Sequence, residues 1–124
     1  MEISWFNEKP KNCVVTLNPG NLTLNKTATS FFENAYSVML GMDIEKRWII
    51  IKPLLKAEAL RHDIPENKKY RITVRSSYSR VTNKAFIDEV LRIFSLECGE
   101  KPPKFVANWL AKEQILVVDL KEEV

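Results

Sequence analysis

The chain has 124 residues and a formal net charge of +3, with 45% hydrophobic and 28% charged residues. This length allows one compact domain with a core, and the composition excludes an intrinsically disordered chain. The one His and the two Cys, which stand 85 positions apart, are too few for a zinc site or a histidine-based triad. We therefore expect a protein that is not an enzyme and that holds no metal and no cofactor.

The N-terminal residues contain no apolar signal segment, and no apolar run reaches the ~18 residues that would span a bilayer. We therefore expect a cytoplasmic protein without membrane contact, in which Cys13 and Cys98 are free thiols. His62 has no evident acid or nucleophile beside it, so a solvated surface position is expected. The first twelve residues are expected to form an arm that docks the rings of Trp5 and Phe6.

The first half of the chain predicts the order strand, strand, helix, strand, strand. Residues 13–18 alternate and are rich in β-forming side chains, so they predict a strand. Pro19 and Gly20 predict a turn, because Pro presets one φ angle and Gly tolerates a positive one. The other expected elements are strand 22–24, a helix from Asn25 or Thr27 to Ala35, and a hairpin of strands 36–41 and 48–51, with Trp48 in the core and Pro53 ending the second strand.

The second half repeats this order after a short helix at 56–61 and a turn at 63–67. Residues 70–75 alternate between apolar and polar side chains and predict a strand with two distinct faces. Asn83 is expected to cap a helix over 84–96, whose apolar residues recur with the helical period. The remaining expected elements are strand 80–82, a loop at 99–104, strands 105–110 and 114–120, and a frayed tail at 122–123.

The two halves align at a constant offset of 58 up to the helix and of 67 after it. At the first offset Val14 falls on Ile72, and Asn25 falls on Asn83. A unit of about 45 residues has too small a core to be stable alone. We therefore predict an α+β fold in which two pseudo-symmetric ββαββ units, residues 12–54 and 70–120, pack as one compact domain over 1–124.

Each predicted unit contains a short strand, a polar helix start and a hairpin, and the first unit ends on Ile51-Lys52-Pro53. This pattern resembles the SpoVT/AbrB superfamily, and the tandem arrangement is similar to its MraZ branch. In MraZ-like repeats an Arg introduces the short strand and an Asp stands four residues before it. Arg80 matches this Arg, while Ser76 stands in place of the Asp. The resemblance implies a DNA-binding transcription regulator.

Residues 67–87 contain six Lys and Arg and no Asp or Glu, whereas the rest of the chain has 13 basic and 16 acidic residues. The strand period predicts that alternate basic residues of 69–75 share one face, and the next turn brings Arg80 beside them. Guanidinium groups and hydroxyls suit phosphate oxygens, which position a nucleic acid without reading its sequence. The expected DNA-contacting residues are Lys69, Arg71, Arg75, Tyr78, Arg80 and Lys84.

Nucleic-acid binding is the first interpretation, and two alternatives stay open beside it. The basic residues of 67–87 are also consistent with a solvated strand face whose charges discourage pairing at the sheet edge. Acids such as Asp43, Glu45 or Asp119 could also neutralise these charges in the fold. The alternative function is a protein-interaction module without catalytic activity, either a homo-oligomer or a binder of another protein. Its anchors would be large exposed rings. The candidate rings are those of Trp5, Phe6, Trp48 and Trp109.

Overall fold

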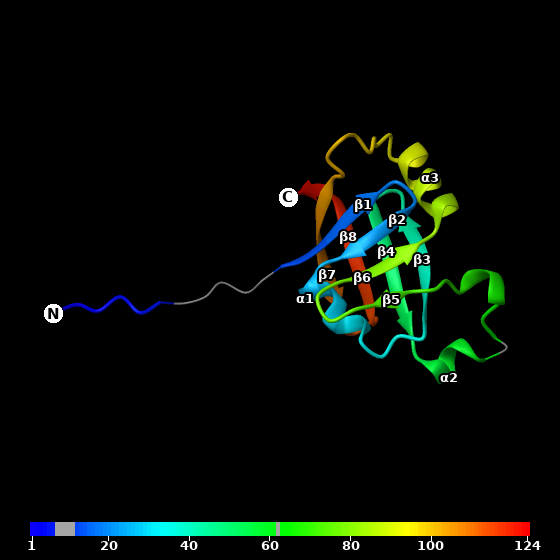
Figure 1. The fold of residues 1–124 in the computed structure, drawn as a ribbon, viewed down its shortest axis with the longest axis horizontal. Helices are drawn as coiled ribbons and strands as arrows, with labels where there is room; N and C mark the ends of the chain where they lie inside the picture. Colours follow the sequence, from blue (N-terminus) through cyan, green and yellow to red (C-terminus); the bar gives the residue numbers. More distant parts are fainter. Residues whose placement is uncertain (7–11, 62) are drawn as a thin grey trace.

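The computed structural model describes residues 1–6, 12–61 and 63–124. Within these residues an eight-stranded antiparallel sheet curls into a half-barrel, and α1 and α3 lie at opposite ends of it (Figure 1). The order in the sheet is β3-β4-β8-β7-β1-β2-β6-β5. The strands are β1 Cys13–Asn18, β2 Asn21–Leu24, β3 Ser37–Asp43, β4 Trp48–Leu54, β5 Thr73–Val74, β6 Ser79–Thr82, β7 Lys104–Leu110 and β8 Ile115–Glu123. The helices are α1 Lys26–Thr29, η1 Ser30–Phe32, α2 Lys56–Ala59, η2 Glu66–Lys68 and α3 Lys84–Ile93, of which η1 and η2 are 3₁₀ helices.

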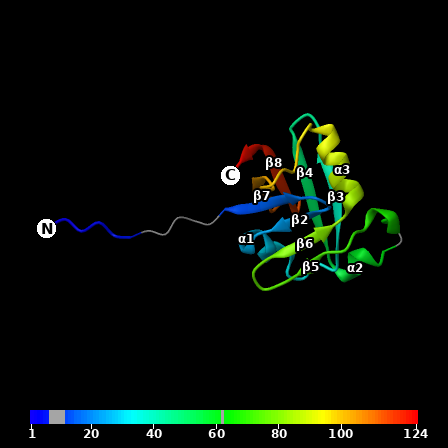
Figure 2. The same cartoon turned by 45° about the horizontal axis from the view of Figure 1, so that its top comes forward.

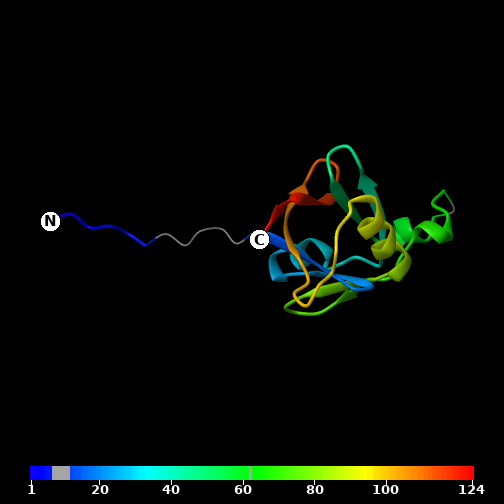
Figure 3. The ribbon, with the colours of Figure 1, turned by 90° about the horizontal axis from the view of Figure 1, so that it is seen from above.

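Alternate strand residues point into the half-barrel and form one core, as the period of two in the sequence predicts. Leu17 of β1 is 1% exposed, and Ile49 of β4 is fully buried. The helices add side chains from the two ends, because Phe32 of η1 and Val90 of α3 are fully buried against the same cluster. Seen from above, the blue and light-green strands form one wall of the half-barrel, and the teal and red strands form the other (Figure 3).

The two ends of the strand order meet at a single bridge. The Val38 N–H donates to the Tyr70 carbonyl oxygen, and the Tyr70 N–H donates back to Val38, both at 2.8 Å. On the other side of the half-barrel β1 and β7 pair over four residues. The contact between β3 and the segment just before β5, which we call the seam, is therefore the weakly paired side of the curled sheet.

The α+β class and the order of elements are as expected, but three strands differ from the expectation. Pro53 lies inside β4, where it is tolerated because it falls beyond the β4 residues that pair with β8. Residues 70–75 do not form one strand, since Tyr70 pairs with Val38 and β5 holds only Thr73 and Val74. The tail is not frayed, because Glu123 is opposite Phe105 in the β7–β8 ladder.

Both long helices end earlier than expected. The first changes from α1 to the 3₁₀ helix η1 at Ser30 and ends at Phe32. The second ends at Ile93, shortly before Ser95 adopts a left-handed φ of 52°. The predicted docking of the N-terminal rings is wrong, since Trp5 is 81% exposed and Phe6 is 90% exposed. His62 lies outside the described residues.

Candidate nucleic-acid interface

The β5–β6 hairpin positions the basic side chains of the second half. The Arg75 N–H donates to the Tyr78 carbonyl oxygen at 2.8 Å and closes a tight turn. Arg80 of β6 then lies opposite Thr73 of β5. Arg71, Arg75 and Arg80 are exposed, while the intervening Ile72 and Val74 are half-buried, so the predicted separation of two faces holds for these residues.

This hairpin continues a polar surface formed by β1 and β2. Thr23 of β2 is opposite Arg80, and Thr16 of β1 is opposite Thr23, so hydroxyls and a guanidinium form one row across the strands. The row reaches Lys104 at the start of β7. Figure 2 shows β2, β6 and β5 side by side. We call the outer surface of β1, β2, β5 and β6 with Arg71, Arg75 and Arg80 the basic face.

The basic face contains no acidic residue, because β1, β2, β5 and β6 contain no Asp or Glu. Within the described ranges Arg71, Arg75 and Arg80 form no ion pair with a carboxylate. The Arg80 guanidinium lies over the Tyr78 ring, 5.5 Å from its centre. This cation–π contact restrains the Arg80 guanidinium without neutralising its charge.

Two of the six residues expected to contact DNA form ion pairs with carboxylates within the protein. The Lys69 Nζ lies 2.8 Å from Glu66 Oε1 and donates to the Arg61 carbonyl oxygen at 3.3 Å. The Lys69 side chain is only 6% exposed, so its placement on the exposed basic face is wrong. It caps the C-terminal end of η2, where the chain folds back toward Glu66.

Lys84 begins α3, and its Nζ lies 2.8 Å from Asp88 Oδ2. The hydrogen bond to Asp88 raises the pKa of Lys84, so the ammonium group stays charged but shares that charge with a carboxylate. Asp43 and Asp119, two of the acids considered as alternative neutralising partners, contact Lys46 and Lys121 in the opposite half of the sheet. Among the described residues, the unpaired positive charge of the basic face therefore comes from its three arginines, with Lys104 at the edge of the same row.

The row of hydroxyls on β1 and β2 was missed by sequence reasoning. Thr16 and Thr23 come to lie beside Arg80 only through the β2–β6 pairing, which joins distant parts of the chain. One sequence signal was available, because residues 13–32 also contain no Asp or Glu. Residues 13–32 and 67–87 both contain no acid, but the sequence does not show that their strands are neighbours. Only that pairing joins the two segments into one continuous surface.

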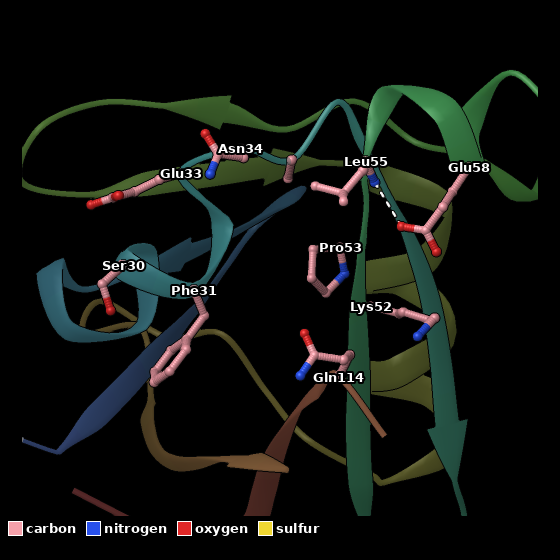
Figure 4. Close-up of a pocket in the computed structure, with 10 residues that line it drawn as sticks. Ser30, Phe31, Glu33, Asn34, Lys52, Pro53, Leu55, Glu58 and Gln114 are labelled. Atoms are coloured by element: carbon pink, nitrogen blue, oxygen red, sulfur yellow. Dashed lines mark hydrogen bonds between the residues drawn. The ribbon is translucent and has the colours of Figure 1, made fainter. Parts of the chain in front are cut away.

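A cleft of about 230 Å³ lies between η1 and the start of α2 (Figure 4). Its two carboxylates, Glu33 and Glu58, lie on opposite sides of the cleft. Glu58 Oε1 accepts from the Leu55 N–H at 3.1 Å, and the Lys52 Nζ donates to the Glu113 carbonyl oxygen at 3.1 Å. Glu58 therefore serves helix capping and Lys52 anchors a loop, and the charged groups of the cleft do not converge on a common point as catalytic acids and bases do.

In the part of the chain that the structure describes, no three His, Cys, Asp or Glu side chains gather closely enough to hold a metal. No helix of residues 1–6, 12–61 and 63–124 has the length and apolar character needed to cross a membrane. Cys13 and Cys98 are free thiols, and burial raises the pKa of each. Comparisons with known protein families, with curated proteins and with solved structures find no match to this chain.

Proposed function

We propose that the protein is a cytoplasmic nucleic-acid-binding regulator that contacts the phosphates of a DNA duplex through its basic face. The observation that carries the proposal is the set of three exposed arginines, without carboxylate partners among the described residues, on four strands that contain no acid. Arg presents several N–H donors in a plane and binds phosphate oxygens in a bidentate manner. Thr hydroxyls in the same row can add neutral hydrogen bonds to the backbone.

The resemblance to the SpoVT/AbrB superfamily and its MraZ branch is part of this proposal, as is the pseudo-twofold relation of two ββαββ units. The strand order supports the relation. When β1–β4 are exchanged with β5–β8, six of the seven neighbouring pairs map onto neighbouring pairs. The seventh, β1–β7, maps onto β3 and β5, and the Val38–Tyr70 bridge lies there, just before β5. The helix starts also agree, since Asn25 and Asn83 both cap their helices through side-chain oxygens.

The turns give the spacing of the two units. The first hairpin turn closes at Asn18 in the first unit and at Arg75 in the second unit. These positions are 57 residues apart, so the expected offset of 58 is one residue too long in these strands. The second hairpin turns end at Arg47 and Gln114, at the expected offset of 67, and these residues have left-handed φ angles of 58° and 56°. With the offset of 57, buried Leu24 corresponds to buried Val81, so equivalent residues share a face.

The two units differ in charge at equivalent positions. The counterparts of Arg71 and Arg75 in the first unit are Val14 and Asn18, and the counterpart of Arg80 is Thr23. The first unit therefore contributes hydroxyls and amides, while the second contributes the charges. We propose one charged contact patch for each chain rather than two equivalent ones.

The test is fluorescence anisotropy of a labelled mixed-sequence duplex at low salt. The triple variant Arg71→Ala, Arg75→Ala, Arg80→Ala should bind about tenfold more weakly or worse, because three phosphate contacts are lost. The matched control, Lys46→Ala, Lys112→Ala, Lys121→Ala, removes the same charge from the β3–β4 and β7–β8 hairpins. Equal weakening by both triple variants would mean that net charge alone is responsible and would refute the proposal.

A second candidate, self-association, is favoured by the outer surface of β3 and β4. A shallow hollow of about 180 Å³ there is lined almost entirely by apolar side chains, with Lys52 as the charged member. Its apolar members include Met39, Ile50 and Ile115. An apolar interface changes little with salt, so sedimentation at several salt concentrations separates it from phosphate binding.

A further inference from the structure

A cavity of about 320 Å³ opens beside the seam where the two ends of the sheet meet. Ser37 of β3, α2 and the segment from Glu66 to Arg71 form its walls. It lies at the weakly paired side of the half-barrel, next to the Val38–Tyr70 bridge. This volume falls within the range of small-molecule sites, which is about 300–1,000 Å³.

The walls combine positive charge with apolar surface. Lys69 and Arg71 both line the cavity, and Glu66 is the one carboxylate among its lining residues in the described chain. The Lys69 ammonium has three N–H donors, of which Glu66 and the Arg61 carbonyl oxygen accept two. One Lys69 donor and the Arg71 guanidinium therefore remain for a ligand. Leu60, which is 57% exposed, and Tyr36, which is 54% exposed, offer apolar contact area.

A buried hydroxyl in this wall has no hydrogen-bond partner among the residues that the structure describes. Ser37 is 8% exposed, and its Oγ makes no hydrogen bond to any described residue. Buried polar atoms in proteins are nearly always hydrogen-bonded, so an exception calls for an explanation. Rotation about one side-chain bond gives a serine hydroxyl three staggered positions. The Oγ is shielded in its present position, and rotation toward the cavity would bring the hydroxyl to a ligand oxygen as its acceptor.

We propose that this cavity is a binding site for a small phosphate monoester with an apolar or aromatic body. The phosphate oxygens accept hydrogen bonds from Lys69, Arg71 and Ser37, and the body of the ligand lies against Leu60 and Tyr36. Three donors match the three terminal oxygens of a monoester. The site shares Arg71 with the basic face, whereas Lys69 and Ser37 belong to the cavity alone, so binding of the monoester is measured without any duplex.

The test is a titration of the full chain with phenyl phosphate, followed by the amide ¹H–¹⁵N signals of the protein. Saturable shifts should appear at Ser37, Leu60 and Tyr70. Inorganic phosphate lacks the ring and benzyl alcohol lacks the charge, so each should bind at least about tenfold more weakly. A response equal to that of phenyl phosphate from either probe, or no saturable shift at all, would overturn the proposal.

Three variants locate the site. Arg71→Gln should weaken phenyl phosphate binding about tenfold, the loss expected for one charge-assisted hydrogen bond. The matched control Lys101→Gln removes one positive charge from the loop before β7, outside both the cavity and the basic face, and should leave the affinity unchanged. Equal losses in these two variants contradict the proposal. Ser37→Ala should weaken phenyl phosphate binding about fivefold, because one donor to the phosphate is lost. It should also raise the unfolding temperature of the free protein, because it removes an unsatisfied hydroxyl. An unchanged affinity in this variant contradicts the assigned role of Ser37.

Discussion

The side chain of Asn25 joins the start of α1 to β1, and replacing it with Ala tests how this corner is held. Asn25 Oδ1 accepts from the Ala28 N–H at 3.0 Å and from the Val14 N–H at 3.1 Å. Its Nδ2 donates to the Asn12 carbonyl oxygen at 2.9 Å. The side chain is thus both a helix cap and a link between the ends of two strands.

The counterpart Asn83 provides the comparison, since its Oδ1 accepts from the Phe86 N–H at 3.0 Å. Loss of a helix cap costs about 1 kcal/mol, and each further hydrogen bond that becomes unsatisfied costs about the same. Asn25→Ala should therefore lower the free energy of unfolding by about 2–3 kcal/mol. Asn83→Ala should lower it by about 1 kcal/mol.

Urea unfolding followed by far-ultraviolet circular dichroism measures both values, with the m value as a check that the unfolded state is unchanged. Asn25→Asp is the control, because it keeps an acceptor for Val14 and Ala28 and places a negative charge at the helix start, where it is favourable, while the exposed bond to Asn12 is replaced by a contact between two oxygens. It should lose less than half of what Asn25→Ala loses. Equal losses in Asn25→Ala and Asn83→Ala would refute the assigned role of the bond to Val14.

Two further predictions concern buried polar and ionisable groups. Thr29 Oγ1 and Ser79 Oγ lie 2.8 Å apart in the core, so Thr29→Val should lower the free energy of unfolding by about 1–3 kcal/mol, because the Ser79 hydroxyl loses its partner. Adding Ser79→Ala should recover most of that loss in urea unfolding, and no recovery would argue against the pairing. Burial raises the pKa of the Cys13 thiol, so the unfolded thiol ionises first and stability should fall as the pH rises above about 8.5. Cys13→Ala should reduce this fall, and an unchanged pH dependence would contradict it.

Local sequence signals predicted the elements whose conformation depends on neighbouring residues. The alternation over Cys13–Asn18 and the turn at Pro19-Gly20 predicted β1 and its hairpin at their observed positions. The helix starts at Asn25 and Asn83 were also predicted, because an asparagine cap acts within one turn. These features need no information about the rest of the fold.

Features that depend on pairing between distant segments could not be predicted in the same way. Tyr70 leaves the expected strand because Val38, which lies far earlier in the chain, offers it two hydrogen bonds. The extension of β8 to Glu123 depends on a register shift between Phe105 and Ala107. Neither partner is visible from the local pattern, since each is selected by how the sheet curls.

The same division applies to the candidate site. The exposure of Arg71 and Arg75 followed from the strand period. Lys69 did not follow it, because the turn of η2 brings Glu66 and the Arg61 carbonyl oxygen to its ammonium group. Large aromatic residues were also difficult to assign. Trp48 was expected in the core, but it is half-buried and lies under the Lys46 ammonium, 4.7 Å from the ring centre.

The most direct test of the central claim is the salt dependence of duplex binding by the wild-type protein. Three arginines that neutralise phosphates should give a slope of about −2.7 in a plot of log K against log salt, at about 0.9 for each contact. The variant without Arg71, Arg75 and Arg80 should give a slope close to zero, while the control triple variant should keep the wild-type slope. A wild-type affinity that does not change with salt, or no binding at low salt, would contradict the account.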